Sequence, residues 1–174
     1  MGTAPSMQIE ENLALAARRG QRRGLSWGVT KDEREEYRRR LGALGLGLES
    51  RLSTKVATLS GGQRQALTLL MATLKRPELL LLDEHTAALD PKTAAKVMEL
   101  TDRIVQENQL TTLMITHNMR DAIQYGNRLI MLHEGRIILD ISGEEKQKLT
   151  VPDLLAQFTR ASGGEFASDR AILS

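Results

Sequence analysis

The feature that most constrains the fold is a block of four consecutive leucines, Leu79–Leu82, that runs directly into Asp83 and Glu84. A short apolar block without polar alternation is typical of a strand buried on both faces, as in sheets covered by helices. Carboxylates at the end of such a strand lie where open α/β sheets bind ligands. The sequence therefore predicts a buried strand with acidic groups at its carboxyl end.

Two further apolar blocks, residues 112–115 and 129–132, extend this pattern. A helix-patterned stretch from Pro91 to Asn108 separates the leucine block from the first of them, and this β-α-β order predicts parallel strands. Glu134-Gly135 then joins residues 129–132 to another apolar run, residues 137–139. A two-residue turn of this kind predicts an antiparallel hairpin. A last helix is predicted over residues 151–160.

Residues 1–58 indicate two helices. Apolar residues recur at helical spacing from Met7 to Arg19, behind Ser6 as the expected first cap. Thr30 and Glu33 form the pattern of a capping box, in which each side chain binds the backbone N–H of the other residue. The second helix is therefore predicted to begin after Thr30.

Composition excludes several classes of function. The chain contains no cysteine, which rules out disulfides, thiolate catalysis and cysteine-ligated metals. Its longest apolar run, residues 13–17, is far shorter than the ~20 residues that cross a bilayer. The net charge of +2 does not favour a nucleic-acid partner, and solvated helix faces explain the arginine pairs better. His85 and His133 are predicted to be loop or surface residues.

The strongest local motif is Leu59-Ser60-Gly61-Gly62-Gln63, followed by a helix pattern that Pro77 closes. Ser60 can cap the helix and Gln63 can reach back to it. The two glycines let another group approach the backbone N–H groups at the positive end of the helix dipole, which is an anion site. A plain capping box, which needs no ligand, explains the same residues.

The strand ends offer a second set of candidates. Asp83 can hold Mg²⁺ directly or through water, and Glu84 can take a proton from an attacking water. Alternatively, the two carboxylates only cap the following loop. Asp90 before Pro91 is a typical helix start. His117 follows the second apolar block, where a neutral imidazole can bind a phosphate oxygen, although a lone histidine at a strand end is more often structural.

In combination, four motifs resemble the ATP-binding cassette (ABC) family of transporter ATPases: Leu59–Gln63, Leu79–Glu84, Ala88-Leu89-Asp90 and Ile115-Thr116-His117. They stand in the family's order, and the resemblance covers Met7 to Asp153. It implies an α/β, P-loop NTPase-like cassette with a helical signature subdomain at residues 1–76. Residues 77–174 would then form the rest of the α/β core, with a partial parallel sheet, an antiparallel hairpin, and a C-terminal helix and tail. His85 and Ala87 depart from the commoner Pro and Ser.

The resemblance also implies roles for the motif residues, with ATP and Mg²⁺ as cofactors. Asp83 resembles the Walker B aspartate that organises Mg²⁺, Glu84 the catalytic glutamate and His117 the switch histidine. Asp90 resembles the D-loop aspartate. The signature loop, which meets the nucleotide of a second cassette, corresponds to Ser60, Gly61, Gly62 and Gln63.

One family motif is missing. A phosphate-cradling loop needs Gly-x-x-x-x-Gly-Lys-[Ser/Thr], and no glycine of this chain is followed by lysine. The sequence therefore resembles the C-terminal two-thirds of a cassette, beginning after the Walker A and glutamine-loop region. On this basis we expect the chain alone to bind ATP weakly and to be inactive in hydrolysis.

Two functions are consistent with these motifs. The first is the ATPase subunit of a membrane transporter of the bacterial uptake type, peripheral on the cytoplasmic face of the membrane. Its implied partners are a membrane-spanning permease, a second cassette and, indirectly, a solute-binding protein, without nucleic acid; an aromatic amino acid is a family-level guess for the solute. The second is a non-catalytic, truncated cassette that acts as an interaction module.

Overall fold

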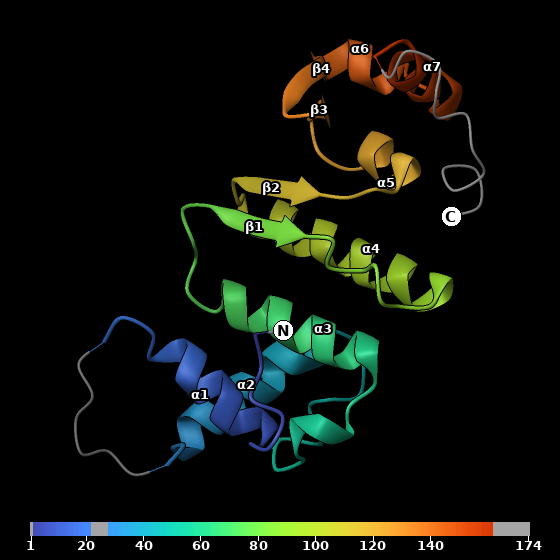
Figure 1. Ribbon diagram of the computed structural model, residues 1–174. Helices are drawn as coiled ribbons and strands as arrows, with labels where there is room; N and C mark the ends of the chain where they lie inside the picture. Colours follow the sequence, from blue (N-terminus) through green and yellow to red (C-terminus); the bar gives the residue numbers. More distant parts are fainter. Residues whose placement is uncertain (1, 22–27, 162–174) are drawn as a thin grey trace. The chain divides into compact units, whose positions relative to one another are not determined.

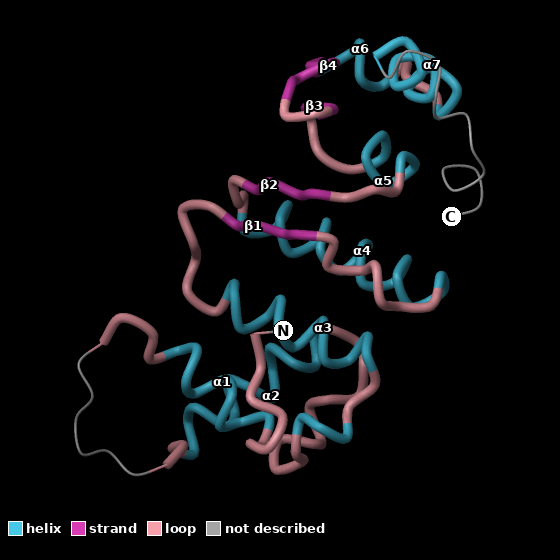
Figure 2. Tube along the Cα trace, in the orientation of Figure 1, coloured by secondary structure: helices cyan, strands magenta, loops and turns pink. Residues whose placement is uncertain are grey.

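The computed structural model describes residues 2–21 and 28–161. The elements follow one another as α1 (Ile9–Ala17), α2 (Lys31–Ala43), the short 3-10 helix η1 (Val56–Thr58), α3 (Gly61–Thr73), β1 (Leu80–Asp83), α4 (Pro91–Asn108), β2 (Thr112–Ile115), α5 (Met119–Gln124), β3 (Arg128–His133), β4 (Arg136–Ser142), α6 (Gly143–Gln147) and α7 (Val151–Ala161) (Figure 2). Across these described residues, every helix is too short or too polar to cross a bilayer.

The chain divides into two compact units, Met1–Met114 and Ile115–Ser174. The subdivision into residues 1–76 and 77–174 that the sequence suggests stays a prediction. Residues 162–174, the predicted C-terminal tail, lie outside the described residues.

Helices of the first unit begin largely where their caps predict. Glu33 N donates to Thr30 Oγ1 at 3.2 Å and Thr30 N donates to Glu33 Oε2 at 2.7 Å, which confirms the capping box at α2. The expected start behind Ser6 is wrong, because α1 begins at Ile9 after Gln8. Buried Asn12 explains the difference: its side chain binds the backbone of Ala4 and Gln8 and so holds the preceding segment outside the helix.

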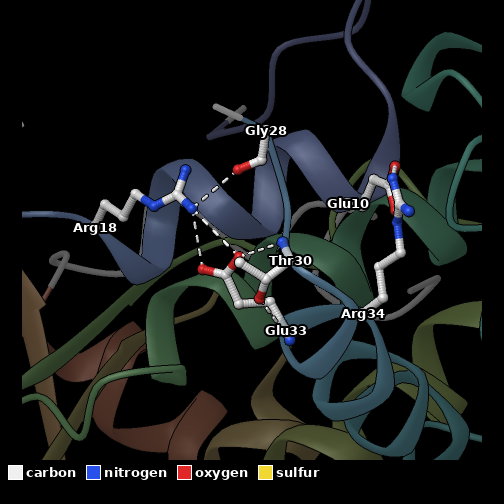
Figure 3. A network of polar contacts seen from close by, with 6 residues as sticks. All are labelled: Glu10, Arg18, Gly28, Thr30, Glu33 and Arg34. Carbon is white, nitrogen blue, oxygen red and sulfur yellow. Dashed lines mark hydrogen bonds and ion pairs between the residues drawn. The ribbon is translucent and has the colours of Figure 1, made fainter. Parts of the chain in front are cut away.

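Helices α1 and α2 are joined by a network of ion pairs (Figure 3). The guanidinium of Arg34 makes a two-point contact with the buried Glu10, at 2.7 and 2.9 Å. Arg18 Nη2 donates to Glu33 Oε1 at 3.0 Å and to the Gly28 carbonyl at 3.1 Å. Glu33 is also the acidic member of the capping box of α2. Its carboxylate therefore accepts from Thr30 N at the start of α2 and pairs with Arg18 at the end of α1.

One apolar core runs through the first unit. The largest of its fully buried side chains come from α1, α2, α3 and the segments between α2 and α3, namely Ile9, Leu13, Leu41, Leu48, Val56 and Leu67. Leu80 and Leu82 of β1 and Leu100 of α4 belong to the same cluster. The helices and one face of the strands thus share a single core.

Strands β1 and β2 pair with each other and point in the same direction, with α4 between them in the chain (Figure 1). This confirms the predicted parallel β-α-β unit. Burial alternates along β1, so Leu80 and Leu82 are inside while Leu79 and Leu81 are exposed. The unbroken leucines predict a strand that is covered on both faces in a complete cassette; within the described residues one face is buried and the other is left exposed.

The second unit contains the predicted antiparallel hairpin. β3 and β4 are joined at Glu134 and Gly135, which both have left-handed backbone angles, φ 48° and 73°. Two such residues in succession make the turn whose twist matches that of paired strands. Buried Lys146 of α6 donates to the Ile123 carbonyl at the end of α5, and burial lowers the pKa of its ammonium group.

Candidate functional site

The signature-like motif forms the start of α3. Gln63 N donates to Ser60 Oγ at 3.3 Å, and Ser60 N donates to Gln63 Oε1 at 3.2 Å. Gln63 Nε2 also donates to the Leu46 carbonyl at 3.2 Å, which fixes the far end of the side chain. The capping-box interpretation of Ser60 and Gln63 is therefore confirmed, and the anion-site interpretation stays a prediction.

The two glycines of this motif face the start of α4. A Cβ atom on Gly62, which is buried, would lie 2.3 Å from Thr93 Cγ2, and one on Gly61 would lie 3.0 Å from Leu89 Cδ2. Real Cβ atoms do not approach so closely as 2.3 Å, so glycine is what permits the contact between α3 and α4. The structure thus brings Gly61 and Gly62 to the residues on either side of Asp90.

Asp90 is the N-cap of α4, as predicted. Its Oδ1 accepts from Thr93 N at 3.1 Å, and Pro91 occupies the first turn. Hydrogen bonding with Thr93, from its side chain first and then its backbone, lowers the pKa of the Asp90 carboxyl. The carboxylate is therefore ionised at neutral pH, beside the glycine-containing start of α3.

Asp83 and Glu84 lie together where β1 ends. Asp83 is the last residue of the strand, and Glu84 follows with a left-handed φ of 43°. Both residues are exposed. The turn behind them is closed by local bonds from Ala87 N to the Glu84 carbonyl and from Leu89 N to the Thr86 carbonyl, each 3.0 Å long. A non-glycine residue adopts a left-handed conformation only where its surroundings hold it, so this turn is a defined structure.

The surroundings of Asp83 fit one kind of magnesium site. Within residues 2–21 and 28–161 no group of three acidic, histidine or cysteine side chains gathers to hold a metal by itself. Mg²⁺ commonly needs only one or two carboxylates, with phosphate oxygens and water completing its shell. An exposed Asp83 therefore suits a magnesium ion that arrives with a nucleotide.

His117 belongs to the second unit, two residues after the end of β2. It is exposed and precedes Asn118, whose side chain caps α5 by accepting from Arg120 N and Asp121 N. Burial raises the pKa of Asp121, and the nearby imidazole of His117 partly offsets this rise. The phosphate-binding role of His117 stays a prediction.

His85 is a residue whose surroundings the sequence did not indicate. It is half-buried, and its Nε2 lies 3.1 Å from Thr101 Oγ1 on α4. His133, predicted like His85 to lie in a loop or on the surface, packs its ring edge-on against Phe158 at 5.1 Å. Neither partner is near in the sequence, so no local motif could have revealed these contacts.

A family model described as "ABC transporter" matches residues 2–87. The chain is 50% identical over 161 residues to a tyrosine transport ATP-binding protein of Clostridioides difficile (strain R20291), covering 92% of this chain and 64% of that protein. It is 35% identical over 150 residues to an aliphatic sulfonates import ATP-binding protein of Escherichia coli (strain K12), covering 81% of this chain and 57% of that protein.

A solved structure gives the same result for the fold. An ATP-binding cassette in a dimeric, post-hydrolysis state with ADP and Pi matches with a TM-score of 0.64 and 29% identity, over 80% of this chain and 58% of that chain. The predicted fold class is thereby confirmed. The chain spans about 64% of the length of the Clostridioides difficile relative.

Proposed function

The chain belongs to the ABC transporter ATPase family, and from this premise we propose that it provides the ATP-hydrolysing part of an importer-type transporter subunit. The observation that carries the proposal is the pair Asp83 and Glu84, exposed at the end of a parallel strand that is buried on one face. The glycine-containing start of α3 supports it, as do the names of the matched relatives, which are ATP-binding proteins of transport and import systems.

In the proposed reaction, Glu84 accepts a proton from the water that attacks the terminal phosphate of ATP, and the bond from that phosphate to ADP breaks, so that ADP leaves. Asp83 holds a magnesium ion, which supplies charge neutralisation for the phosphates. His117 hydrogen-bonds a phosphate oxygen. Ser60, Gly61, Gly62, Gln63 and Asp90 contact the nucleotide held by a second cassette, and the dimeric neighbour with ADP and Pi supports this pairing.

The proposed partners follow from the same role. They are a membrane-spanning permease, a second cassette and, indirectly, a solute-binding protein, with the chain lying on the cytoplasmic face of the membrane. The 50% identity to a tyrosine transport protein supports an aromatic amino acid as the solute class. The solute itself contacts the permease and the binding protein, so this part of the proposal rests on similarity alone.

The test is ATP hydrolysis by a hybrid cassette, in which residues 1–174 are joined to the part of the Clostridioides difficile relative that they do not match. We expect the hybrid to hydrolyse ATP and Glu84→Gln to lower kcat by about 10²-fold or more while nucleotide binding persists, because glutamine cannot accept the proton. The chain without the added part should bind ATP weakly and not hydrolyse it, since Gly-x-x-x-x-Gly-Lys-[Ser/Thr] is absent.

The unmodified relative, assayed beside the hybrid, is the positive control. An active relative with a folded but inactive hybrid would contradict the proposed ATPase and favour the interaction-module alternative. Hydrolysis that survives Glu84→Gln unchanged would contradict the role of Glu84 alone.

A further inference from the structure

The turn that carries Glu84 is connected to the middle of α4 by a side chain. His85, the next residue, is half-buried and its Nε2 lies 3.1 Å from Thr101 Oγ1. Thr101 is 4% exposed and lies on α4, well away from the N-cap Asp90. This contact therefore joins the segment after β1 to a buried position in the middle of the helix.

The direction of the hydrogen bond follows from the partners of Thr101. Its hydroxyl donates to the Val97 carbonyl at 2.7 Å and has only one hydrogen to donate. Toward His85 the hydroxyl oxygen therefore acts as the acceptor, and the Nε2–H of His85 is the donor. The imidazole is thus held in one tautomer and one orientation.

The local bonds of the turn do not by themselves fix how it sits on the helix. The bonds from Ala87 N and Leu89 N both end within the turn itself, at the carbonyls of Glu84 and Thr86. The hydrogen bond from His85 instead ends on α4. This hydrogen bond constrains the backbone at His85, next to Glu84. Glu84 itself has a left-handed φ of 43°, a conformation that needs support from its surroundings.

We propose that His85 is a positioning residue, which holds the Glu84 turn in place by donating a hydrogen bond to Thr101. The proposal rests on the proposed function for its catalytic consequence, because the position of the Glu84 carboxylate matters only if it activates water. Misplacement of a catalytic group by about 1 Å can cost ~10²-fold in rate, so a support one residue away affects turnover.

The first test measures amide hydrogen exchange in the 174-residue chain. Thr101→Val keeps the shape of the side chain and removes the acceptor, whereas Thr101→Ser keeps the hydroxyl and serves as the matched control. We expect faster exchange at Ala87 and Leu89 in Thr101→Val only, with the amides of α3 unchanged as a measure of global stability. Equal protection of the turn in all three proteins would overturn the proposal, and so would a uniform rise at every amide.

The second test uses the hybrid cassette and separates positioning from binding. His85→Phe keeps a ring without the donor, and His85→Gln restores an N–H at similar reach. We expect His85→Phe and Thr101→Val to lower kcat by about 10-fold to 100-fold with KM within about 2-fold, and His85→Gln and Thr101→Ser to recover most of the rate. A loosened turn with unchanged kcat would overturn the positioning role. If the unsubstituted hybrid is inactive, the proposed function fails, while the exchange experiment still decides whether His85 holds the turn.

Discussion

The helices α1–α3 and the sheet β1–β2 lie in consecutive parts of the chain but differ in how completely they bury their apolar residues. In the helical part, Leu13, Leu41 and Leu67 are all 0% exposed, and charged residues pair across α1 and α2 (Figure 3). In the sheet, Leu81 is 64% and Leu113 is 52% exposed. Leucine content therefore does not determine burial. A leucine is buried only where the described residues supply other elements that pack against its face of the helix or sheet.

The largest expected effect tests this contrast directly. Leu67→Ala should lower the free energy of unfolding by about 2–5 kcal/mol, because it opens a cavity in the helical core. Leu81→Ala removes the same atoms from an exposed position and should change it by about 0.5 kcal/mol or less. Urea unfolding of both variants gives the comparison, and equal losses would mean that Leu81 is buried in solution.

A smaller effect is expected where the helical part contacts α4. Gly62→Ala places a methyl group 2.3 Å from Thr93 Cγ2 and should cost about 1–3 kcal/mol of stability by overpacking. Thr93→Ser, which removes that methyl group and keeps the hydroxyl, should restore much of the loss in the double variant. Full stability of Gly62→Ala in urea unfolding would contradict the tight contact between Gly62 and Thr93.

The capping box of α2 gives the next effect in size. Thr30→Ala should cost about 1 kcal/mol, because Glu33 N loses its acceptor. Hydrogen bonding from the Thr30 backbone, as the largest cause, lowers the pKa of Glu33 below its ordinary value of 4.5. The stabilisation that comes from the ionised Glu33 carboxylate is therefore fully present above pH 4.5. It is lost as the pH falls through the pKa of Glu33 in the folded state.

Thermal unfolding at about every half pH unit between pH 3 and pH 7 measures the loss of this contribution from Glu33. Glu33→Gln removes the titrating group and should show a shallower dependence than the unsubstituted chain. An identical dependence in both proteins would contradict the contribution of Glu33.

Leu81→Lys is expected to have the smallest effect on the free energy of unfolding. It should, however, clearly increase the solubility of the chain. An exposed apolar sheet face favours self-association, and a lysine on that face opposes it. Light scattering should show less association for Leu81→Lys, while the matched surface change Gln106→Lys on α4 should leave it unaltered. Association that is equal in the two variants would show that the exposed face is not responsible.

The sequence predicted the features that depend on neighbouring residues. The capping boxes at Thr30 and Ser60, the bounds of α4 and the hairpin turn at Glu134-Gly135 are all as predicted. Each is determined by local hydrogen bonds or backbone angles. The predicted cap at Ser6 failed because Asn12, further along the chain, fixes the preceding segment.

The candidate site shows the same division. Asp83-Glu84 and Ser60–Gln63 could be found because each is a continuous motif. The close approach of Gly62 to Thr93 and the bond from His85 to Thr101 could not, since they depend on how α3 and β1 pack against α4. Burial on one face of the sheet likewise depends on tertiary packing, because an unbroken run of leucines looks the same whether one or two layers cover it.

The turn at Glu134 and Gly135 has a consequence for the order in which the chain folds. The hairpin that it closes pairs Arg128 with Ser142 through residues that are near neighbours in the chain, and such hairpins form in about 1–10 μs. The pairing of β1 with β2, in contrast, joins residues on either side of α4, as does the bond from Leu80 N to the Thr111 carbonyl just before β2, so the whole of α4 must be brought into a loop first. The hairpin can therefore serve as an early nucleus for the second unit, while the sheet next to Glu84 is among the later structures to form.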